Sequence, residues 1–171
     1  MKIERGSESL PVMESFYSIQ GEGYHSGKPA YFIRLAGCDV KCTWCDVKDS
    51  WGISPDQYLD VNKIVNKIDQ VSAEIIVITG GEPLHHNLDK LTSSLKKIGK
   101  KIHLETSGTE PLTGEFDWVC LSPKKNKKPL DHFFKIADEL KMVIYRINDF
   151  RWAERNACLL YTSPSPRDMW T

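Results

Sequence analysis

The chain has 171 residues, of which 40% are hydrophobic, and its 23 basic and 23 acidic side chains give a formal net charge of zero at pH 7. This length suffices for one domain with a real core, and the balanced charge gives no sign of a nucleic-acid or acidic membrane partner. No apolar run approaches the roughly 18 residues of a membrane span. Clustered cysteines without a secretory signal indicate a reducing compartment, so we expect a cytoplasmic protein.

The first predicted elements are two strands joined by a glycine-rich loop. Residues 13–18 alternate weakly and are rich in aromatic side chains, which is typical of a strand. The loop at residues 19–27 opens no helix, which argues against a phosphate-binding loop. Residues 30–35 predict a buried strand interrupted by Arg34, and Gly37 then turns the chain into the next segment.

That segment carries three cysteines, Cys38, Cys42 and Cys45, at C-x3-C-x2-C spacing. They cannot share one side of a strand, because alternate side chains point to opposite faces, so we expect a loop around a metal centre. Iron–sulfur clusters usually take four thiolates, so three leave one iron open, as catalytic metal sites require. The alternative is a structural zinc site completed by His25 or Cys120, although zinc motifs more often come as two separated pairs.

Helices and strands alternate after the cysteine segment. Asp60 is a good N-cap for a helix whose apolar positions between residues 61 and 71 are spaced three and four apart. Residues 75–79 form a β-branched run typical of a buried parallel strand. Asn87 can cap a second helix, and Gly99 stands where the residue after a helix is often glycine.

Strands at 102–106 and 118–121, a helix at 133–140 and a further strand at 142–145 complete the pattern. This alternation predicts parallel βαβ units, too few for a closed eight-fold barrel, with ligands gathered at the carboxyl ends of the strands. Cys120, inside a predicted strand, is expected to be a small buried hydrophobe. The lysines after Lys124 are expected to lie in a solvated basic loop.

Three segments together resemble the radical S-adenosylmethionine (SAM) enzymes. The cysteine motif, with Trp44 before its last cysteine, resembles the signature of that family. Thr-Gly-Gly-Glu-Pro at 79–83 resembles the segment that holds the SAM amino group, and residues 105–109 resemble a further SAM-contacting segment. The resemblance implies an incomplete (β/α) barrel of mostly parallel strands. It also implies a [4Fe–4S] cluster on the three cysteines, whose open iron binds SAM and from which an adenosyl radical results.

The resemblance assigns SAM contacts to four segments. The residues are Trp44, Cys45, Asp46, Gly80, Gly81, Glu82, Ser107, Ser122, Pro123 and Lys124. The two glycines let the backbone approach a ligand closely. Glu82 either neutralises the SAM ammonium or caps the following helix, and Ser107 binds either the SAM carboxylate or its own turn. Ser122 and Lys124 are candidates for the adenosine portion.

Within this superfamily, the stretch upstream of the cysteines resembles the 7-carboxy-7-deazaguanine synthase family. The similarity runs from about residue 13 to residue 156 and rests on residues 16–23, 27–30 and 34–38. It implies conversion of 6-carboxy-5,6,7,8-tetrahydropterin to 7-carboxy-7-deazaguanine with loss of ammonia, on the way to queuosine and other 7-deazapurines. In the family, SAM is regenerated and is therefore a reused cofactor.

The same resemblance implies a set of substrate-binding residues and no catalytic residue beyond the cluster and SAM. They are Ile19, Gln20, Gly21, Glu22, Arg34 and Thr79. Arg34 offers a forked, permanently charged donor for a carboxylate, and its place in an apolar strand speaks against a surface ion pair. Gln20 and Glu22 offer complementary donors and acceptors for the pterin amide and amine edge.

Two departures from the family pattern bear on activity. Members often carry a hydroxyl that binds Mg2+ directly after the Cys-Asp pair, where this chain has Val47. Because a hard cation takes oxygen ligands, either Asp46 or Asp49 substitutes or the Mg2+ dependence is weaker. Residues 158–171 resemble a translated sequencing adapter, so we expect a single domain at 1–157 that is truncated. It lacks the terminal proline that helps bind substrate in the family, a loss able to inactivate the enzyme.

Two other readings stay open on the sequence alone. One is a radical SAM activase of an anaerobic ribonucleotide reductase or a glycyl-radical lyase, and the other is a non-catalytic zinc-binding module. The residues from Gln20 to Gly23, together with Arg34, argue against the activase, because a protein substrate needs no such loop. The family resemblance further suggests a homodimer, a flavodoxin-type electron donor and a small pterin substrate, without nucleic acid or membrane partners.

Overall fold

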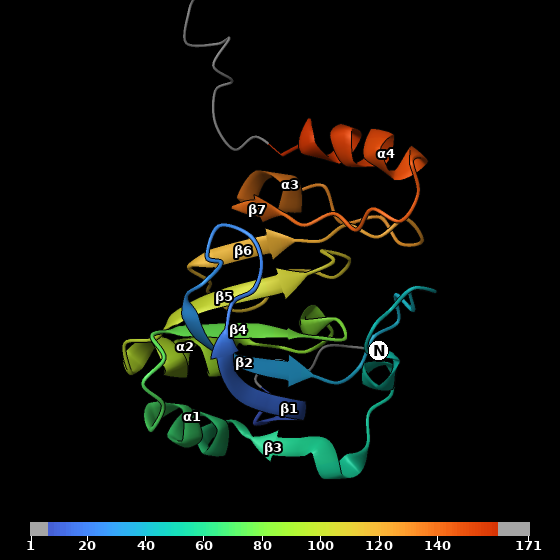
Figure 1. Cartoon of the computed structure of the whole chain (residues 1–171). Coiled ribbons are helices and arrows are strands. Elements are labelled where there is room, and N and C mark those ends of the chain that lie inside the picture. Colours follow the sequence, from blue (N-terminus) through green and yellow to red (C-terminus); the bar gives the residue numbers. More distant parts are fainter. Residues whose placement is uncertain (1–6, 161–171) are drawn as a thin grey trace, which may run out of the picture.

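The computed structural model describes residues 7–160, and their strands form one seven-stranded sheet in the order β3-β1-β2-β4-β5-β6-β7 (Figure 1). The strands are β1 (Ser9–Ile19), β2 (Pro29–Leu35), β3 (Tyr58–Asp60), β4 (Ile75–Gly80), β5 (Lys101–Thr106), β6 (Trp118–Leu121) and β7 (Glu139–Leu140). The helices are α1 (Val61–Asp69), α2 (Asp89–Lys97), α3 (Phe133–Ile136) and α4 (Asn148–Ala157), with short 3-10 turns η1 (Lys48–Trp51), η2 (Pro55–Gln57) and η3 (Pro83–His85).

Five neighbouring strands run parallel, from β2 through β4, β5 and β6 to β7, which confirms the mostly parallel α/β prediction. Strand β1 instead pairs antiparallel with both β2 and β3. In Figure 1 the arrows of β2, β4, β5 and β6 point the same way, so their carboxyl ends meet at one edge of the sheet. Segments that follow these strands are therefore brought together, as ligand sites in such sheets require.

The two longer helices predicted before residue 100 form, although the N-cap of α2 is Leu88, one residue later than the Asn87 that the sequence indicated. The Asp60 side chain accepts a hydrogen bond from the backbone N–H of Asn62 (2.7 Å) and caps α1. The Asn87 side chain accepts from the backbone N–H of Asp89 (3.0 Å) at the start of α2. Gly99 follows α2 at a φ of +77°, the left-handed conformation that glycine adopts at low cost.

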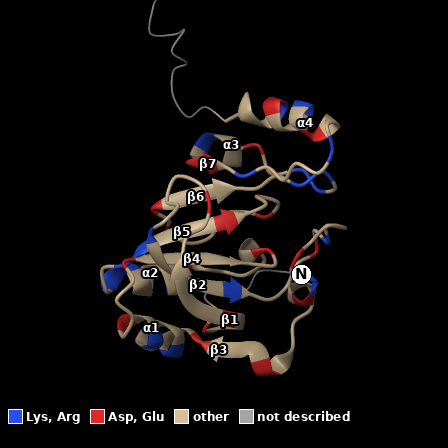
Figure 2. Cartoon of the chain, viewed as in Figure 1, with Lys and Arg blue, Asp and Glu red and all other residues tan. Residues whose placement is uncertain are grey.

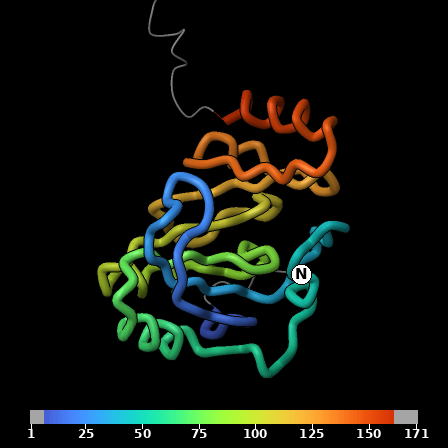
Figure 3. The backbone as a smooth tube through the Cα atoms, viewed as in Figure 1, coloured from blue at the N-terminus to red at the C-terminus, as the bar shows by residue number. Residues whose placement is uncertain are grey.

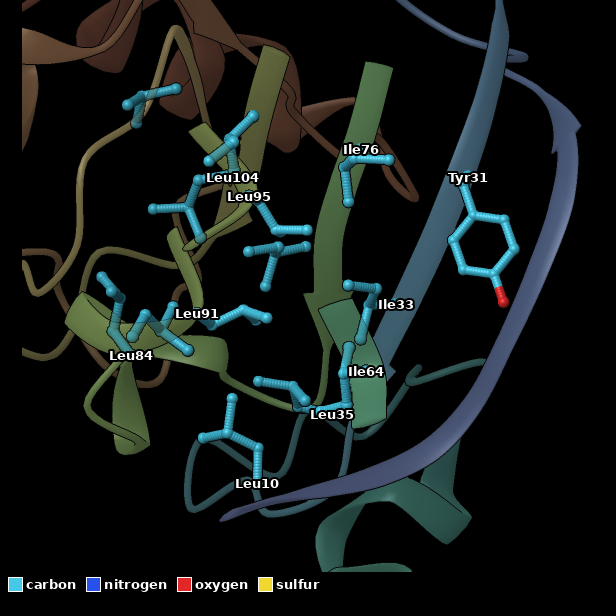
Figure 4. Packing of buried hydrophobic residues seen from close by; sticks show 14 of the residues in the cluster. Leu10, Tyr31, Ile33, Leu35, Ile64, Ile76, Leu84, Leu91, Leu95 and Leu104 are labelled. Atoms are coloured by element: carbon cyan, nitrogen blue, oxygen red, sulfur yellow. The ribbon is translucent and has the colours of Figure 1, made fainter. Parts of the chain in front are cut away.

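One face of the sheet is the main hydrophobic core. Alternate strand residues point to it, because side chains in a strand alternate between faces. Among them are Tyr31, Ile33, Leu35, Ile76, Ile78, Ile102, Leu104, Val119 and Leu121. Helices α1, α2 and α3 cover this face and contribute side chains such as Ile64, Leu95 and Phe133 to the cluster. Figure 4 shows how the aliphatic side chains of strands and helices interdigitate there.

The other face of the same strands carries a different set of side chains. Its residues are Ala30, Phe32, Arg34, Ile75, Val77, Thr79, His103, Glu105, Trp118 and Cys120. A small buried cluster, Ala30, Ile75 and Val77, lies near the amino ends of the strands. Arg34, Thr79 and Glu105 lie near the carboxyl ends, so this face turns polar where ligands are expected.

Two predicted elements after residue 130 are wrong. The helix expected over 133–140 ends at Ile136, because Ala137 is extended (ψ 135°) and the chain there joins the sheet. The backbone N–H of Asp138 donates to the Val119 carbonyl (2.9 Å), and the Asp138 side chain accepts from the Val119 N–H (2.8 Å). The strand expected at 142–145 is irregular chain, and its place in the sheet is taken by β7.

The described part of the chain contains no helix that is long and apolar enough to cross a membrane. The tail expected to be an adapter begins at residue 158, directly after α4, and its residues 161–171 lie outside the described part. The division into a domain at 1–157 and a foreign tail stays a prediction.

Candidate functional site

A cavity of about 480 Å3 lies at the carboxyl ends of β2, β4, β5 and β6. This size falls within the range of small-molecule and cofactor sites. Its walls come from the cysteine loop, from the loops after β4, β5 and β6, and from the polar ends of the open sheet face. The segments that follow these strands therefore meet at one cavity, as the strand pattern predicts.

The cysteine loop surrounds one side of this cavity. The thiols of Cys38, Cys42 and Cys45 all line it. The loop folds back on itself, because Lys41 has a left-handed φ of +48° and the N–H of Cys45 donates to the Cys42 carbonyl (3.0 Å). Its two ends are tied together where the N–H of Cys38 donates to the Trp51 carbonyl (3.3 Å). One compact turn thereby brings the three cysteines to the same cavity wall, where the Cys42 thiol also lies 3.9 Å from the side-chain oxygen of Asn126.

The side chains of Cys38, Cys42 and Lys124 are all partly buried, and this burial shifts their pKa values. Burial raises the pKa of both Cys38 and Cys42, and the nearby positive charge of Lys124 opposes this rise at Cys42. Burial also lowers the pKa of Lys124, whose ammonium lies 5.5 Å from the centre of the Trp44 ring. A metal cluster that bound here would favour the thiolate forms that burial disfavours.

The glycine turn after β4 is held tightly against the start of the cysteine loop. The N–H of Gly81 donates to the Leu35 carbonyl (2.9 Å), and the N–H of Glu82 donates to the Gly37 carbonyl (2.9 Å). A Cβ on Gly80, whose φ is +139°, would lie 2.1 Å from the Leu35 oxygen. A Cβ on Gly81 would lie 2.4 Å from the Gly37 oxygen. Both positions therefore require glycine for packing reasons alone.

Glu82 is buried, with 1% of its surface exposed, and its carboxylate is fully engaged. It accepts from the N–H of Leu84 (3.1 Å), from the Thr106 hydroxyl (2.6 Å) and from the N–H and hydroxyl of Ser107. The capping role foreseen for Glu82 is therefore present at the start of η3. The Ser107 hydroxyl faces Glu82, and the SAM contacts of both residues stay predictions.

Arg34 lines the cavity and also makes the ion pair that the sequence argued against. Its Nε donates to Glu14 Oε1 at 2.6 Å across the antiparallel pair of β1 and β2. The exposed fraction is 21% for the Arg34 side chain and 49% for the Glu14 side chain. A guanidinium has five N–H donors, so this pair leaves the others available. The carboxylate-binding role of Arg34 stays a prediction.

Glu105 joins the predicted substrate residues into one network. It accepts from the Thr79 hydroxyl (3.2 Å) and from the Gln20 amide (3.3 Å), and it lines the cavity. Glu22 also lines the cavity and is paired with Lys141. Burial works to lower the pKa of Lys141, but the Glu22 hydrogen bond and the charge of Glu105 outweigh it, so the pKa is raised.

The other predicted residues divide between the cavity wall and its surroundings. Trp44, Cys45, Asp46, Gly80, Gly81, Glu82, Ser107, Ser122 and Lys124 line the cavity. Ile19, Gly21 and Pro123 do not line it, and the Ile19 side chain is 61% exposed. Gln20 lines a separate cavity of about 20 Å3 beside it.

Sequence reasoning missed Lys141 as a cavity residue. It placed Glu105 in the segment 105–109 that resembles a SAM contact, but did not foresee its network with Thr79 and Gln20. Lys141 had no usable signal in the sequence, because it reaches the site only through the pairing of β7 with β6. Glu105 is an acidic residue and Lys141 is a basic residue, and both line the main cavity.

Two lysines of the solvated loop expected after Lys124 also form ion pairs with neighbouring segments. Lys127 donates to Asp39 (2.8 Å) in the cysteine loop and to Glu110 (2.7 Å) after β5. Lys125 is paired with Asp149 of α4, whose pKa this hydrogen bond lowers to about 2. These lysines therefore fasten their loop to neighbouring segments.

The fourth ligands considered for a zinc site lie elsewhere. Neither His25 nor Cys120 lines the cavity that the three thiols share. Both line the separate small cavity, and burial raises the pKa of Cys120 to about 12. Cys120 is 7% exposed, which confirms it as a small buried hydrophobe.

Comparison with known proteins agrees with this geometry. The model of the radical SAM superfamily matches residues 32–152, which include the cysteine loop and the glycine turn. The chain is therefore a radical SAM enzyme.

Its relatives narrow the assignment. The chain is 52% identical to a 7-carboxy-7-deazaguanine synthase of Flavobacterium psychrophilum, over 91% of this chain and 73% of that protein. It is 48% identical to one of Synechocystis, over 87% of this chain and 72% of that protein. The crystal structure of QueE from Escherichia coli superposes with a TM-score of 0.82 at 33% identity, covering 95% of this chain and 81% of that one. The chain belongs to the 7-carboxy-7-deazaguanine synthase family.

The family implies a [4Fe–4S] cluster and SAM, and the residues present fit both groups. Three cysteines of one loop, all on the cavity wall, can supply three of the usual four cluster ligands. The glycine turn beside them also lines the cavity and packs so closely on the start of the cysteine loop that a Cβ on Gly81 would lie 2.9 Å from the Cβ of Cys38. For Mg2+ the fit is poorer, since Val47 offers no ligand and Asp46 is the carboxylate of that stretch on the cavity wall.

Proposed function

We propose that this chain converts 6-carboxy-5,6,7,8-tetrahydropterin to 7-carboxy-7-deazaguanine with loss of ammonia, as a step toward queuosine or another 7-deazapurine. The observation that carries the proposal is the composition of the cavity wall. Three cysteines and a glycine turn line it together with Arg34, Glu22 and Glu105. The proposed substrate has both a carboxylate and an amine-rich ring, so its charges and donors complement these three charged side chains.

Arg34 is proposed to bind the substrate carboxylate. The N–H groups of its guanidinium that Glu14 does not take match a carboxylate in a two-pronged arrangement. Because Glu14 holds Nε, the guanidinium has one fixed edge and is preorganised. A lysine at this position would keep the charge and lose the fork.

The pterin ring is proposed to bind against the Glu105 network. Glu105 and Glu22 are acceptors for ring amine and amide N–H groups, and the Thr79 hydroxyl and Gln20 amide hold Glu105 in place. Lys141 offsets the negative charge of the two carboxylates. The half-buried aromatic ring of Phe32 adds an apolar wall for the flat substrate.

When bound, the cluster and SAM supply the hydrogen abstraction that starts the reaction. The protein contributes position and exclusion of water. Lys124, Ser122 and Trp44 lie where they can hold the adenosine portion, with the Lys124 ammonium fixed by the Ser122 carbonyl (2.8 Å). The substrate loses only ammonia, so the overall conversion consumes no oxidant or reductant.

Several finer assignments belong to the same proposal. Asp46 is proposed to bind Mg2+ in place of the hydroxyl that Val47 lacks. A flavodoxin-type protein is proposed as the electron donor, and its negative surface would complement the lysine-rich loop after β6, seen as blue backbone in Figure 2. A homodimer in the cytoplasm is proposed from the family and from the free thiols, which need a reducing compartment.

The test is an anaerobic turnover assay on the reconstituted chain with the carboxytetrahydropterin, SAM and a reductant. Mass spectrometry should show 7-carboxy-7-deazaguanine and ammonia. Arg34→Gln should raise KM for the pterin by about tenfold or more, since a charged hydrogen bond is lost. Arg151→Gln, at an exposed position of α4, is the matched control and should behave as the wild type. SAM cleavage that yields no pterin-derived product and is stimulated by a partner protein would overturn the proposal and favour an activase.

A further inference from the structure

The loop between β1 and β2, residues 20–28, is closed at its base and reaches across the open face of the sheet. The N–H of Gln20 donates to the Lys28 carbonyl (2.9 Å), and the N–H of Gly27 donates to the Gln20 carbonyl (2.8 Å). Figure 3 shows the loop extending from β1 and β2 over the strands that follow β4. It carries Gln20 and Glu22, two of the residues assigned to the substrate.

Aromatic rings at the tip of this loop pack on β5 and β6, away from β1 and β2, the strands that the loop connects. The Tyr24 ring stacks on Trp118 of β6, with centroids 5.3 Å apart and planes at 21°. The His25 ring meets Trp118 edge-on at 4.6 Å and lies 4.5 Å from the ring of His103 on β5. Contacts of this kind stabilise beyond the area they bury.

Glu139 of β7 secures the same tip through polar contacts. One of its carboxylate oxygens accepts from the N–H of Tyr24 (3.3 Å) and from the indole N–H of Trp118 (3.2 Å). A Cβ on Gly23, at its φ of +70°, would lie 1.7 Å from the other Glu139 oxygen. A side chain at residue 23 would therefore have to displace the Glu139 carboxylate from its contacts with the loop.

Beneath the tip, the loop encloses the cavity of about 20 Å3 that His25, His103, Glu105 and Gln20 help to line. This volume holds about one water molecule. His25 Nε2 is buried there without a hydrogen-bond partner among the described residues, so a water in this cavity would satisfy it. Burial, together with the charge of His25, lowers the pKa of His103 to about 4, so the two rings pack without repulsion at neutral pH.

We propose that Tyr24 and His25, docked on Trp118 and His103, form a latch that positions Gln20 and Glu22 for the pterin. The inference rests on the proposed function, because it assigns the latch to the same substrate. None of the four latch residues lines the main cavity, so they are positioning residues that act through their neighbours in the loop.

Backbone hydrogen bonds close the base of the loop and Glu139 contacts its tip, and the aromatic rings add to these contacts in fixing the residues between them. Gly21 and Gly23 flank Glu22, and a glycine backbone is free to adopt many conformations. The Glu22 side chain pairs with Lys141, and the Gln20 amide donates to Glu105 and accepts from the backbone N–H of Glu22 (3.3 Å). Without the aromatic anchor, the loop would lose its register over β5 and β6, and the substrate would have to order it on binding.

The test compares His25→Ala, His25→Phe and Ser26→Ala on the full reconstituted chain. Two readouts are used: hydrogen exchange of residues 20–28, and KM and kcat for the carboxytetrahydropterin. His25→Ala should speed exchange in the loop and raise KM about five- to tenfold, with kcat changed less than about twofold. His25→Phe keeps a ring against Trp118 and should recover most of the lost KM. Ser26→Ala, exposed in the same loop, should match the wild type in both readouts, and so should the affinity of His25→Ala for SAM.

The outcomes separate this inference from the proposed function. Unchanged exchange in His25→Ala would overturn the latch, because the rings would not be the anchor. Faster exchange with an unchanged KM would overturn its positioning role. A wild-type chain that binds SAM but neither binds nor converts the pterin would overturn the proposed function, and the positioning role would fall with it. The exchange readout would still show whether the rings anchor the loop.

Discussion

The two faces of the central sheet are built from the same strands but differ in almost every physical respect. Toward α1, α2 and α3, side chains such as Ile78 and Leu104 are fully buried and aliphatic. Their immediate neighbours in sequence, Thr79 and Glu105, point to the open face and line the cavity. Of two adjacent residues in a strand, one therefore packs in the core and the next lines the cavity.

This difference shows how the fold supports a reactive centre. The helix-covered face has no polar task and can pack closely, which stabilises the sheet. The open face accepts a cost, since buried polar groups such as Glu82 and His103 need partners or lose their charge. Ligand sites form where the second face meets the loops at the carboxyl edge. Four changes test this division, and they are ordered from the largest expected effect to the smallest.

Cys42→Ala should abolish activity, because it removes a thiol from the set of three on the cavity wall. Iron content after anaerobic reconstitution and the visible absorbance of the cluster should fall with it. Cys120→Ala is the control, since that buried thiol lies outside the main cavity and should keep its iron. If Cys120→Ala loses iron as completely as Cys42→Ala, the cluster has been placed wrongly.

Leu104→Ala and Glu105→Gln compare the faces at adjacent positions. Leu104 is fully buried in the core, so its truncation should lower the free energy of unfolding by about 2–5 kcal/mol in urea. Glu105→Gln keeps the shape of the side chain and one acceptor oxygen. It should lower the free energy of unfolding by less than about 1 kcal/mol and raise KM for the pterin. Equal losses of stability in the two variants would contradict the division between packing and chemistry.

Gly81→Ala should weaken SAM binding about thirtyfold, or ~2 kcal/mol, because a Cβ there would lie 2.4 Å from the Gly37 oxygen and must displace the turn. Equilibrium binding of SAM to the reconstituted protein measures this. Gly52→Ala adds the same atom where nothing lies within 4 Å, and its SAM affinity should stay at the wild-type value. Unaltered SAM affinity in Gly81→Ala would show that the turn does not face SAM.

We expect the free energy of unfolding to depend on pH through His103, which lies on the open face of the sheet. Its pKa is lowered to about 4 by burial first and the charge of His25 second, whereas in the unfolded chain it is about 6.5. Unfolding therefore takes up a proton between these values, so the free energy of unfolding should fall by about 1–2 kcal/mol from pH 7 to pH 5. Urea unfolding at both pH values measures the drop, and His103→Leu should reduce it. An equal drop in His103→Leu would assign it to other groups.

Much of the architecture follows from local pattern, and what does not follow depends on pairing between distant segments. Strands β4 and β6 and the helix cap at Asp60 can be predicted from the sequence, because periodicity and capping are local. The helix expected to continue past Ile136 ends because the edge of β6 offers hydrogen bonds to Asp138, which local propensity does not show.

The candidate site divides in the same way. The cysteine spacing and the glycine turn are motifs within short stretches, and the structure brings both to one cavity. The Arg34–Glu14 pair, the ion pairs of Lys127 and the anchoring of Tyr24 on Trp118 join residues that lie far apart in the sequence. A side chain's partner across such a distance depends on strand order and register, which the motifs do not contain.

The most direct test is electron paramagnetic resonance of the anaerobically reconstituted and reduced protein, recorded with and without SAM, alongside metal analysis. We expect about four irons and four sulfides per chain and a cluster signal that SAM shifts, because the iron without a cysteine ligand is the one SAM reaches. Stoichiometric zinc without iron, or a cluster signal that SAM leaves unchanged, would contradict an open-face cavity in which three thiols and the glycine turn act on one cofactor.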